Sequence, residues 1–349
     1  MPEAILDPEL PIIDPHHHLW DRSMFPPAAG PEHPFTTAIK PAQRYLLDEL
    51  LADTGSGHNV IATVFLECSA FYRAEGPAEL KSLGETEFVN GVAAMSASGL
   101  YGPTRACAGI VGRAELTLGD GVKPVLEQHI AVAGGRDGSG GRFRGIRNSA
   151  SWDADSAVLG PLNRLEAGHY RRDDFRAGFR HLAPMGLSFD AWLLEPQLPD
   201  LIDLARAFPD TTIVLDHVGT PLGRGGYAGK LDERFPIWRD NIRELAKSPN
   251  VVVKLGGLAM AFCNFPSFLA EPRVSSQQLA GEWRPYIETC IEAFGAERCM
   301  FESNFPVDMG SCDYATLWNA FKRLAAGASS DEKTALFSGT ARRIYRLEV

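Results

Sequence analysis

Eight short apolar segments, rich in β-branched residues, recur along the chain at intervals of roughly 25 to 50 residues. Each is followed by sequence with helical periodicity, an alternation that parallel strands joined by crossover helices produce. Because parallel strands are covered on both faces, they tolerate continuous apolar runs such as Ile213-Val214-Leu215. The predicted strands are residues 11–14, 60–67, 107–112, 143–147, 187–194, 212–216, 251–255 and 298–303.

Eight strand–helix units predict a (β/α)8 TIM barrel, a fold that reaches 349 residues as a single domain, here residues 1–349. The alternative, a doubly wound open sheet, lacks the expected Gly-x-Gly-x-x-Gly turn after its first strand. Segments 23–39, 221–234 and 259–276 follow strands 1, 6 and 7, so we expect rim insertions over a pocket. The glycine run 134–141 predicts a flexible surface loop.

The composition excludes several classes of partner. With 34 basic and 44 acidic residues the formal net charge is −10, and neither nucleic acid nor an anionic membrane is expected to bind such a chain. No apolar run is long enough to span a membrane, and the first ten residues carry no export signal. The six scattered cysteines indicate reduced thiols. We therefore expect a cytoplasmic protein with a small-molecule partner, and a homo-oligomer is compatible with these features.

Three consecutive histidines, His16, His17 and His18, follow the first predicted strand. Side chains alternate along a strand, so His16 and His18 should share one side, about 7 Å apart, with His17 on the other. Two imidazoles placed in this way can hold a metal ion or flank a substrate. A solvated turn and a pair of core histidines are the alternatives.

Polar residues also end the other predicted strands. In a TIM barrel the catalytic groups come from the C-terminal ends of several strands, and a protein without a site does not need a polar tip on each strand. The pattern therefore predicts one site, with candidate side chains Glu67, Arg113, Arg144, Arg147, Glu195, Asp216, His217, Lys254, Glu302, Ser303 and Asn304.

Four segments are more specific: Asp14-x-His16-x-His18, Leu215-Asp216-His217-Val218-Gly219-Thr220-Pro221, Val253-Lys254-Leu255-Gly256-Gly257-Leu258, and residues 294–306, which end Glu302-Ser303-Asn304-Phe305-Pro306. In this order they resemble the amidohydrolase-related family, and within it the branch of sugar lactonases and 2-pyrone-4,6-dicarboxylate lactonase. The resemblance implies a TIM barrel, hydrolysis of lactones and, in some members, one divalent metal. It equates His16 and His18 with the strand-one pair, His217 with the strand-six histidine and Arg147 with a substrate-binding arginine.

The chain departs from the family at the last strand, where members have an aspartate and this chain has Asn304. An amide is no base near neutral pH and is a poorer metal ligand. Glu302 lies two residues earlier on the same face of the strand, so it is a candidate replacement. Lys254, on the neighbouring strand, is expected either to pair with Glu302 or to bind a substrate carboxylate.

The remaining candidates concern the substrate. Arg113 and Arg147 suit an anionic group, although arginines at strand ends also pair with acids of neighbouring loops. Trp20 is a candidate pocket wall or a core residue.

The function predicted from these features is hydrolysis of a carboxylated or sugar-acid lactone by activated water. Zinc or manganese, bound by His16, His18 and Glu195 or His217, would activate the water, or else His217 or Glu302 would take its proton. No organic cofactor is expected. The alternatives are a metal-dependent, non-oxidative decarboxylase of an unsaturated or aromatic acid, and a catalytically silent ligand-binding barrel.

Overall fold

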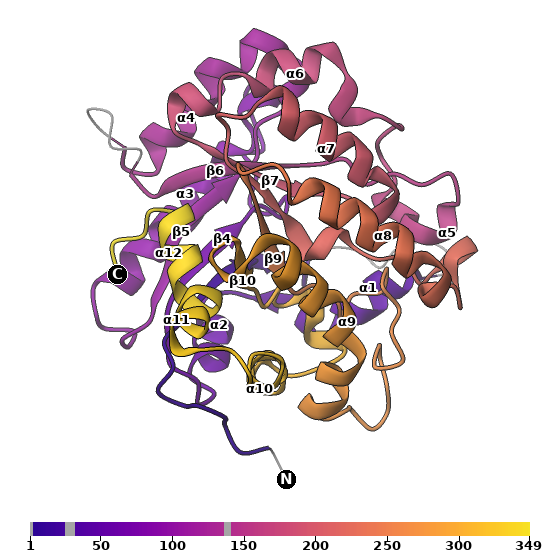
Figure 1. The fold of residues 1–349 in the computed structure, drawn as a ribbon. Helices are drawn as coiled ribbons and strands as arrows, with labels where there is room; N and C mark the ends of the chain where they lie inside the picture. The colour runs from indigo at the N-terminus through magenta and orange to yellow at the C-terminus, as the bar shows by residue number, and fades with distance from the viewer. Residues whose placement is uncertain (1–2, 25–31, 136–140) are drawn as a thin grey trace.

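The structure, a computed structural model, describes residues 3–24, 32–135 and 141–349. Eight parallel strands form one sheet in the order β1-β4-β5-β6-β7-β8-β9-β10, surrounded by helices (Figure 1). The predicted TIM barrel is confirmed. The strands are β1 (Ile12–His17), β4 (Val60–Leu66), β5 (Arg105–Gly112), β6 (Phe143–Ser149), β7 (Ser188–Trp192), β8 (Ile213–Leu215), β9 (Val251–Leu255) and β10 (Cys299–Phe301).

The barrel closes where β1 meets the segment after β10. The Asn304 amide donates to the His16 carbonyl at 2.9 Å, and the His18 amide donates to the Phe305 carbonyl at 2.8 Å. Strand β1 therefore extends to His17, beyond the predicted end at residue 14. The two ends of the chain are joined at the rim where the candidate residues lie.

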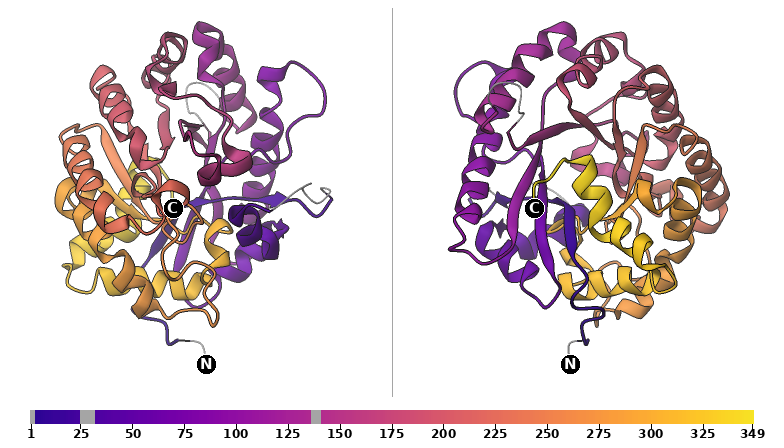
Figure 2. Two further views of the ribbon diagram at one scale, coloured as in Figure 1. Left: turned by 90° about the vertical axis from the view of Figure 1, so that its right-hand side faces the viewer. Right: turned by 60° about the vertical axis from the view of Figure 1, so that its left-hand side comes forward.

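The main helices lie outside the sheet and cover its outer face (Figures 1 and 2). Helix α2 begins at Leu47, after the short strand β3 (Arg44–Tyr45), which pairs with β2 (Trp20–Asp21). The helices are α1 (Pro34–Ile39), α2 (Leu47–Thr54), α3 (Leu83–Ala97), α4 (Val122–Val132), α5 (Ser156–Leu159), α6 (Asp173–Phe179), α7 (Leu198–Ala207), α8 (Leu231–Leu245), α9 (Ser276–Phe294), α10 (Tyr314–Leu324), α11 (Ser330–Thr334) and α12 (Thr340–Ile344).

The inner face of the barrel changes from apolar to charged along the strands. Side chains two residues apart on a strand share a face, so each apolar inner residue is followed two positions later by a residue nearer the C-terminal rim. Three strands repeat this change, in the buried pairs Val214 and Asp216, Val252 and Lys254, and Met300 and Glu302. The strand pattern thus places buried charges directly beneath the rim.

The predicted insertions surround this rim unequally. Phe35, from segment 23–39, and Met260, from segment 259–276, line the main pocket, whereas segment 221–234 packs beside it, with Tyr227 donating to Asp153 at 2.8 Å. Residues 25–31 and 136–140 lie outside the described residues, and with the latter most of the predicted glycine-rich loop. Within the described ranges no helix is long and apolar enough to cross a membrane.

Candidate active site

A pocket of about 560 Å³ opens at the C-terminal rim of the barrel. Its wall includes residues from the segment after β1, from the C-terminal ends of β6 and β7, from the loops after β4, β5, β8 and β10, and from the insertions. Of the residues predicted from sequence, seven line it: His18, Trp20, Glu67, Arg113, Arg147, His217 and Asn304. The structure therefore brings seven of the fourteen candidate residues to one cavity.

The histidine run has the predicted alternation. The His16 and His18 rings lie 5.0 Å apart, centre to centre, while His17 turns away and contacts Thr63 Oγ1 at 2.8 Å. His18 Nδ1 lies 2.9 Å from the Leu66 carbonyl oxygen, so Nδ1 carries the proton and Nε2 is left as an acceptor. His16 is buried beneath the pocket wall and His18 forms part of it.

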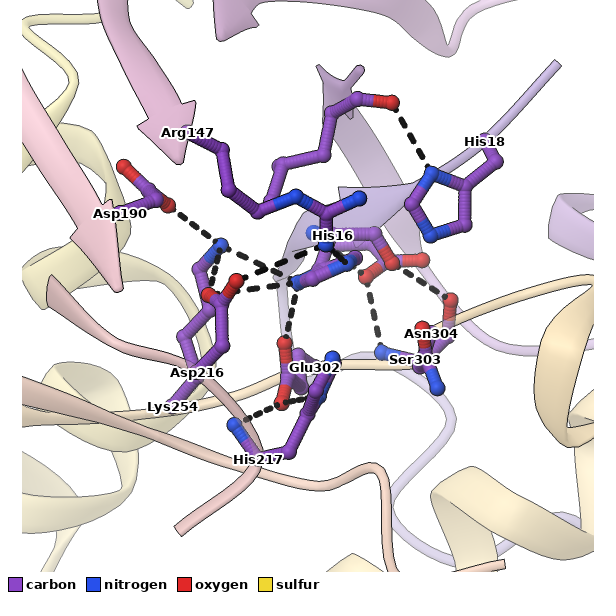
Figure 3. A network of polar contacts seen from close by, with 12 residues as sticks. His16, His18, Arg147, Asp190, Asp216, His217, Lys254, Glu302, Ser303 and Asn304 are labelled. Carbon is purple, nitrogen blue, oxygen red and sulfur yellow. Dashed lines mark hydrogen bonds and ion pairs between the residues drawn. The ribbon is translucent and has the colours of Figure 1, made fainter. Parts of the chain in front are cut away.

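His217 and Glu302 form the central pair of the site (Figure 3). His217 Nδ1 lies 2.7 Å from Glu302 Oε1, and the His217 backbone amide donates to the same oxygen at 3.1 Å. Glycines make this approach possible, since a Cβ on Gly257 would lie 2.4 Å from His217 Nδ1, and Gly257 has a φ of +66°. His217 itself has a φ of +57°, a strained conformation that is typical of functional positions.

Lys254 lies below the pocket, fully buried, and does not form its wall. Its Nζ lies 2.7 Å from Asp190 Oδ2, 3.1 Å from Asp216 Oδ1 and 3.2 Å from His16 Nδ1. The prediction that Lys254 contacts substrate or pairs with Glu302 is therefore corrected. Asp190 and Asp216 neutralise the charge of Lys254, because all three side chains lie on the inner face of the barrel next to one another.

Arg147 lies at the pocket floor, where its Nε lies 2.9 Å from Glu67 Oε1 and its Nη1 lies 3.3 Å from His16 Nε2. Arg113 lines the cavity, and its Nη2 forms an ion pair with Glu115 Oε2 at 3.3 Å. Trp20 donates from its indole to the Ala42 carbonyl at 2.6 Å and presents its ring to the pocket. These three residues lie where a substrate would contact them.

Asn304 is held by an acid that the sequence analysis did not consider. Its Nδ2 donates to Asp308 Oδ1 at 2.8 Å, so the amide oxygen is the free end of a side chain that lines the pocket. Burial raises the pKa of Asp308 to about 7. Asn304 is thus an oriented acceptor rather than a base.

Glu195 does not join these residues. Its carboxylate pairs with Arg234 Nε at 2.8 Å, in the segment that packs beside the pocket, and it does not line the cavity. Within the described residues, the group that could hold a metal ion combines His16 with His217 and Glu302, whose ligand atoms lie within 4.8 Å of one another, and it contains neither Glu195 nor His18.

The buried charges polarise one another. Burial alone would raise the pKa of Glu302, but the His217 and His16 imidazoles lower it to about 2. Burial, followed by the Lys254 ammonium, lowers the pKa of His16 well below its usual value. Glu302 is therefore ionised and His16 neutral over the range in which an enzyme works.

The His16, His217 and Glu302 group has the residue types of a metal site, and its members contact one another more closely than the ligands of a bound ion would. Glu302 contacts His16 Nδ1 at 2.6 Å and His217 Nδ1 at 2.7 Å. Ligands of a tetrahedral zinc ion lie about 3.3 Å apart, given zinc–nitrogen bonds of about 2.0 Å. Lys254 and Arg147 also face the two ring nitrogens of His16, so cations already occupy both directions.

Several residues of the site were missed by the sequence analysis. Asp190 is recognisable in the sequence as an acid within an apolar strand, whereas the others do not lie at the ends of predicted strands. They are Asp190, Asp308, Tyr345, which donates to Asp190 Oδ2 at 2.6 Å, and the pocket residues Arg22, Arg164 and His169.

Known proteins resemble this chain along almost its whole length. The model of a family described as amidohydrolase matches residues 13–347. The uncharacterized protein y4mH of Sinorhizobium fredii is 35% identical over 348 residues, 97% of this chain and 99% of that protein. The L-fucono-1,5-lactonase of Burkholderia multivorans is 32% identical over 229 residues, 64% of this chain and 68% of that enzyme.

A solved structure agrees with these relatives. An amidohydrolase of Burkholderia multivorans, crystallised with bound zinc, has a TM-score of 0.70 and 26% identity, and the match covers 96% of this chain and 99% of that one. The barrel, the histidines of β1 and the extent of the match lead to one conclusion. The chain belongs to the amidohydrolase family and is an enzyme of that superfamily.

Proposed function

We propose that the chain hydrolyses a lactone that carries a carboxylate or several hydroxyls. The hydrogen bond between His217 Nδ1 and Glu302 Oε1, 2.7 Å long, is the observation that supports this proposal most strongly. With Nδ1 occupied, His217 presents Nε2 to the pocket that it lines. A histidine oriented by a buried carboxylate is an effective general base.

In the proposed reaction, His217 Nε2 takes a proton from water, whose oxygen attacks the lactone carbonyl carbon. Glu302 stabilises the imidazolium that forms, and Arg147, at the pocket floor, stabilises the oxyanion. The ring carbon–oxygen bond then breaks, and His217 returns the proton to the departing alkoxide, which gives a hydroxy acid. Asn304, held by Asp308, orients the water through its amide oxygen.

The charge of the pocket favours an anionic substrate. Four arginines, Arg22, Arg113, Arg147 and Arg164, line it against two glutamates, Glu67 and Glu115, although the chain as a whole has a net charge of −10. The Arg22 guanidinium lies 4.2 Å from the centre of the Trp20 ring, and Arg164 Nε donates to the Pro161 carbonyl at 3.1 Å, so neither is paired with a carboxylate among the residues that the structure describes. Arginine binds carboxylates through paired donors, so these two residues would recognise an acid group.

We also propose that the chain's own residues perform this chemistry, with the Lys254 ammonium as the resident cation beside His16. The L-fucono-1,5-lactonase of Burkholderia multivorans supports the reaction type, since the chain is 32% identical to it over 229 residues. Residues 1–349 would act as one domain in the cytoplasm, where the six unpaired cysteine thiols stay reduced.

The test is a panel of lactones followed with a pH indicator, in which neutral sugar-acid lactones are compared with lactones that carry a second carboxylate. We expect ring opening, with a lower KM for the carboxylated compounds, and an increase in that KM for Arg164→Gln. Release of carbon dioxide from unsaturated or aromatic acids, without ring opening of any lactone, would replace the proposal by the decarboxylase alternative.

A further inference from the structure

We propose that Tyr345, which lies at the end of the barrel opposite the pocket, is a positioning residue for the active site. Its hydroxyl fixes Asp190, which fixes the Lys254 ammonium beside Asp216 and His16, and His16 contacts Glu302. The inference depends on the proposed function only for its kinetic test, because the chain of contacts can also be tested without turnover.

The contacts form a continuous path. Tyr345 donates to Asp190 Oδ2 at 2.6 Å, and the same oxygen lies 2.7 Å from Lys254 Nζ. Lys254 Nζ lies 3.2 Å from His16 Nδ1, which lies 2.6 Å from Glu302 Oε2. Glu302 then contacts His217, the proposed base. Figure 3 shows the path from Asp190 to His217.

Tyr345 itself is remote from the substrate. It follows α12, which packs against β1 and β10, and its ring joins the apolar inner residues of the barrel, among them Ile13, Val214 and Val252. It does not line the pocket. In Figure 2, right, this segment is yellow and lies across one end of the barrel.

The path matters because its charges are buried and have few partners. Within the described residues, Asp190 Oδ1 has no hydrogen-bond partner, so Tyr345 and Lys254 are the two donors to this carboxylate. A buried carboxylate that loses one of two donors binds the remaining cation more closely. Without the Tyr345 hydroxyl, Lys254 is therefore drawn toward Asp190 and away from His16 and Asp216.

A residue that only fills the end of the barrel would behave differently. The Lys254 ammonium lies 5.6 Å from the centre of the Tyr345 ring, so the ring also has a packing role. Tyr345→Phe retains the ring and removes only the hydroxyl. The matched control is Tyr45→Phe, because Tyr45 is also buried, donates to Asp53 at 2.6 Å and does not line the pocket.

The kinetic test measures kcat and KM of both variants with the best lactone. We expect Tyr345→Phe to lower kcat by about 5- to 20-fold, in keeping with the loss of one hydrogen bond to a charged group, with KM unchanged. Tyr45→Phe should leave both constants unchanged. Equal kcat values for Tyr345→Phe and Tyr45→Phe would overturn the proposal.

A double-mutant cycle tests the route. If Tyr345 acts through Asp190, adding Tyr345→Phe to Asp190→Asn should lower kcat by less than twofold beyond the effect of Asp190→Asn alone. Full additivity of the two changes would show that Tyr345 acts by packing, and would refute the proposed route.

A spectroscopic test does not require a substrate. The imidazole nitrogen resonances of His16, identified by their loss in His16→Asn, should shift in Tyr345→Phe and not in Tyr45→Phe. An unchanged His16 signal in folded Tyr345→Phe would reject the positioning role. If no lactone is hydrolysed but this signal shifts, the proposed function fails and the positioning role is supported.

Discussion

Glu302→Gln is the sharpest test of the proposed base, because it changes one charge and almost no volume. In the wild type, proton transfer creates an imidazolium whose Nδ1 lies 2.7 Å from a buried carboxylate oxygen. With the charge centres about 4 Å apart and an effective dielectric constant of about 20, the attraction is about 4 kcal/mol. This energy corresponds to about a 10³-fold decrease in kcat when the charge is removed.

The assay is lactone ring opening followed with a pH indicator, with thermal unfolding as a check on folding. Glu195→Gln is the matched control, since it also removes a buried carboxylate from an ion pair, with Arg234 at 2.8 Å, but outside the pocket. We expect Glu195→Gln to retain at least half of the wild-type kcat. A kcat of Glu302→Gln within about fivefold of the wild type would refute the assignment of His217 and Glu302 as the base pair.

Three further predictions concern metal, the substituted amide and pH. By elemental analysis, purified wild-type protein should bind less than about 0.1 equivalent of zinc, and Lys254→Met should bind more because it frees His16. Stoichiometric zinc in the wild-type protein would contradict this prediction. Asn304→Asp places a carboxylate about 2.8 Å from the Asp308 carboxylate, where the two acids must share a proton, so kcat should fall at pH 8. A higher kcat would show that Asn304 impairs the reaction of the wild-type enzyme. Burial, with a smaller contribution from the Glu67 carboxylate, raises the pKa of Glu85 to about 8. Protonated Glu85 therefore contributes fully to the free energy of unfolding below pH 4.5, and this contribution is lost as the pH rises through 8. The Tm should therefore fall over that range in the wild type and less in Glu85→Gln, and equal slopes would disprove the effect.

The fold was predictable because the strand pattern is redundant. Runs such as Ile213-Val214-Leu215 mark buried parallel strands, and eight of them at regular spacing leave few alternatives to a barrel. The end of β1 was less predictable. It depends on backbone bonds between His18 and Phe305, which no local pattern contains.

The site was predictable where a residue ends a strand, as His18, Arg147 and His217 do. Partner choice was not, because it depends on which inner-face residues are neighbours in the closed barrel. Lys254 was expected to face Glu302, yet Asp190 and Asp216 lie closer, at 2.7 and 3.1 Å. Tyr345 was missed since its contact with Asp190 joins residues 155 positions apart.

The substitution at Asn304 gains a physical meaning from Glu302. A carboxylate at position 304 would face the pocket, as the Asn304 side chain does, and would contact water directly. The carboxylate at position 302 lies deeper and does not line the pocket, and there it contacts Nδ1 of His217 and leaves Nε2 for the water. A deeper acid orients and stabilises the base instead of acting as one. The proton acceptor is therefore expected to be an imidazole here, and Asn304 can keep a neutral side chain, which Asp308 holds through a hydrogen bond.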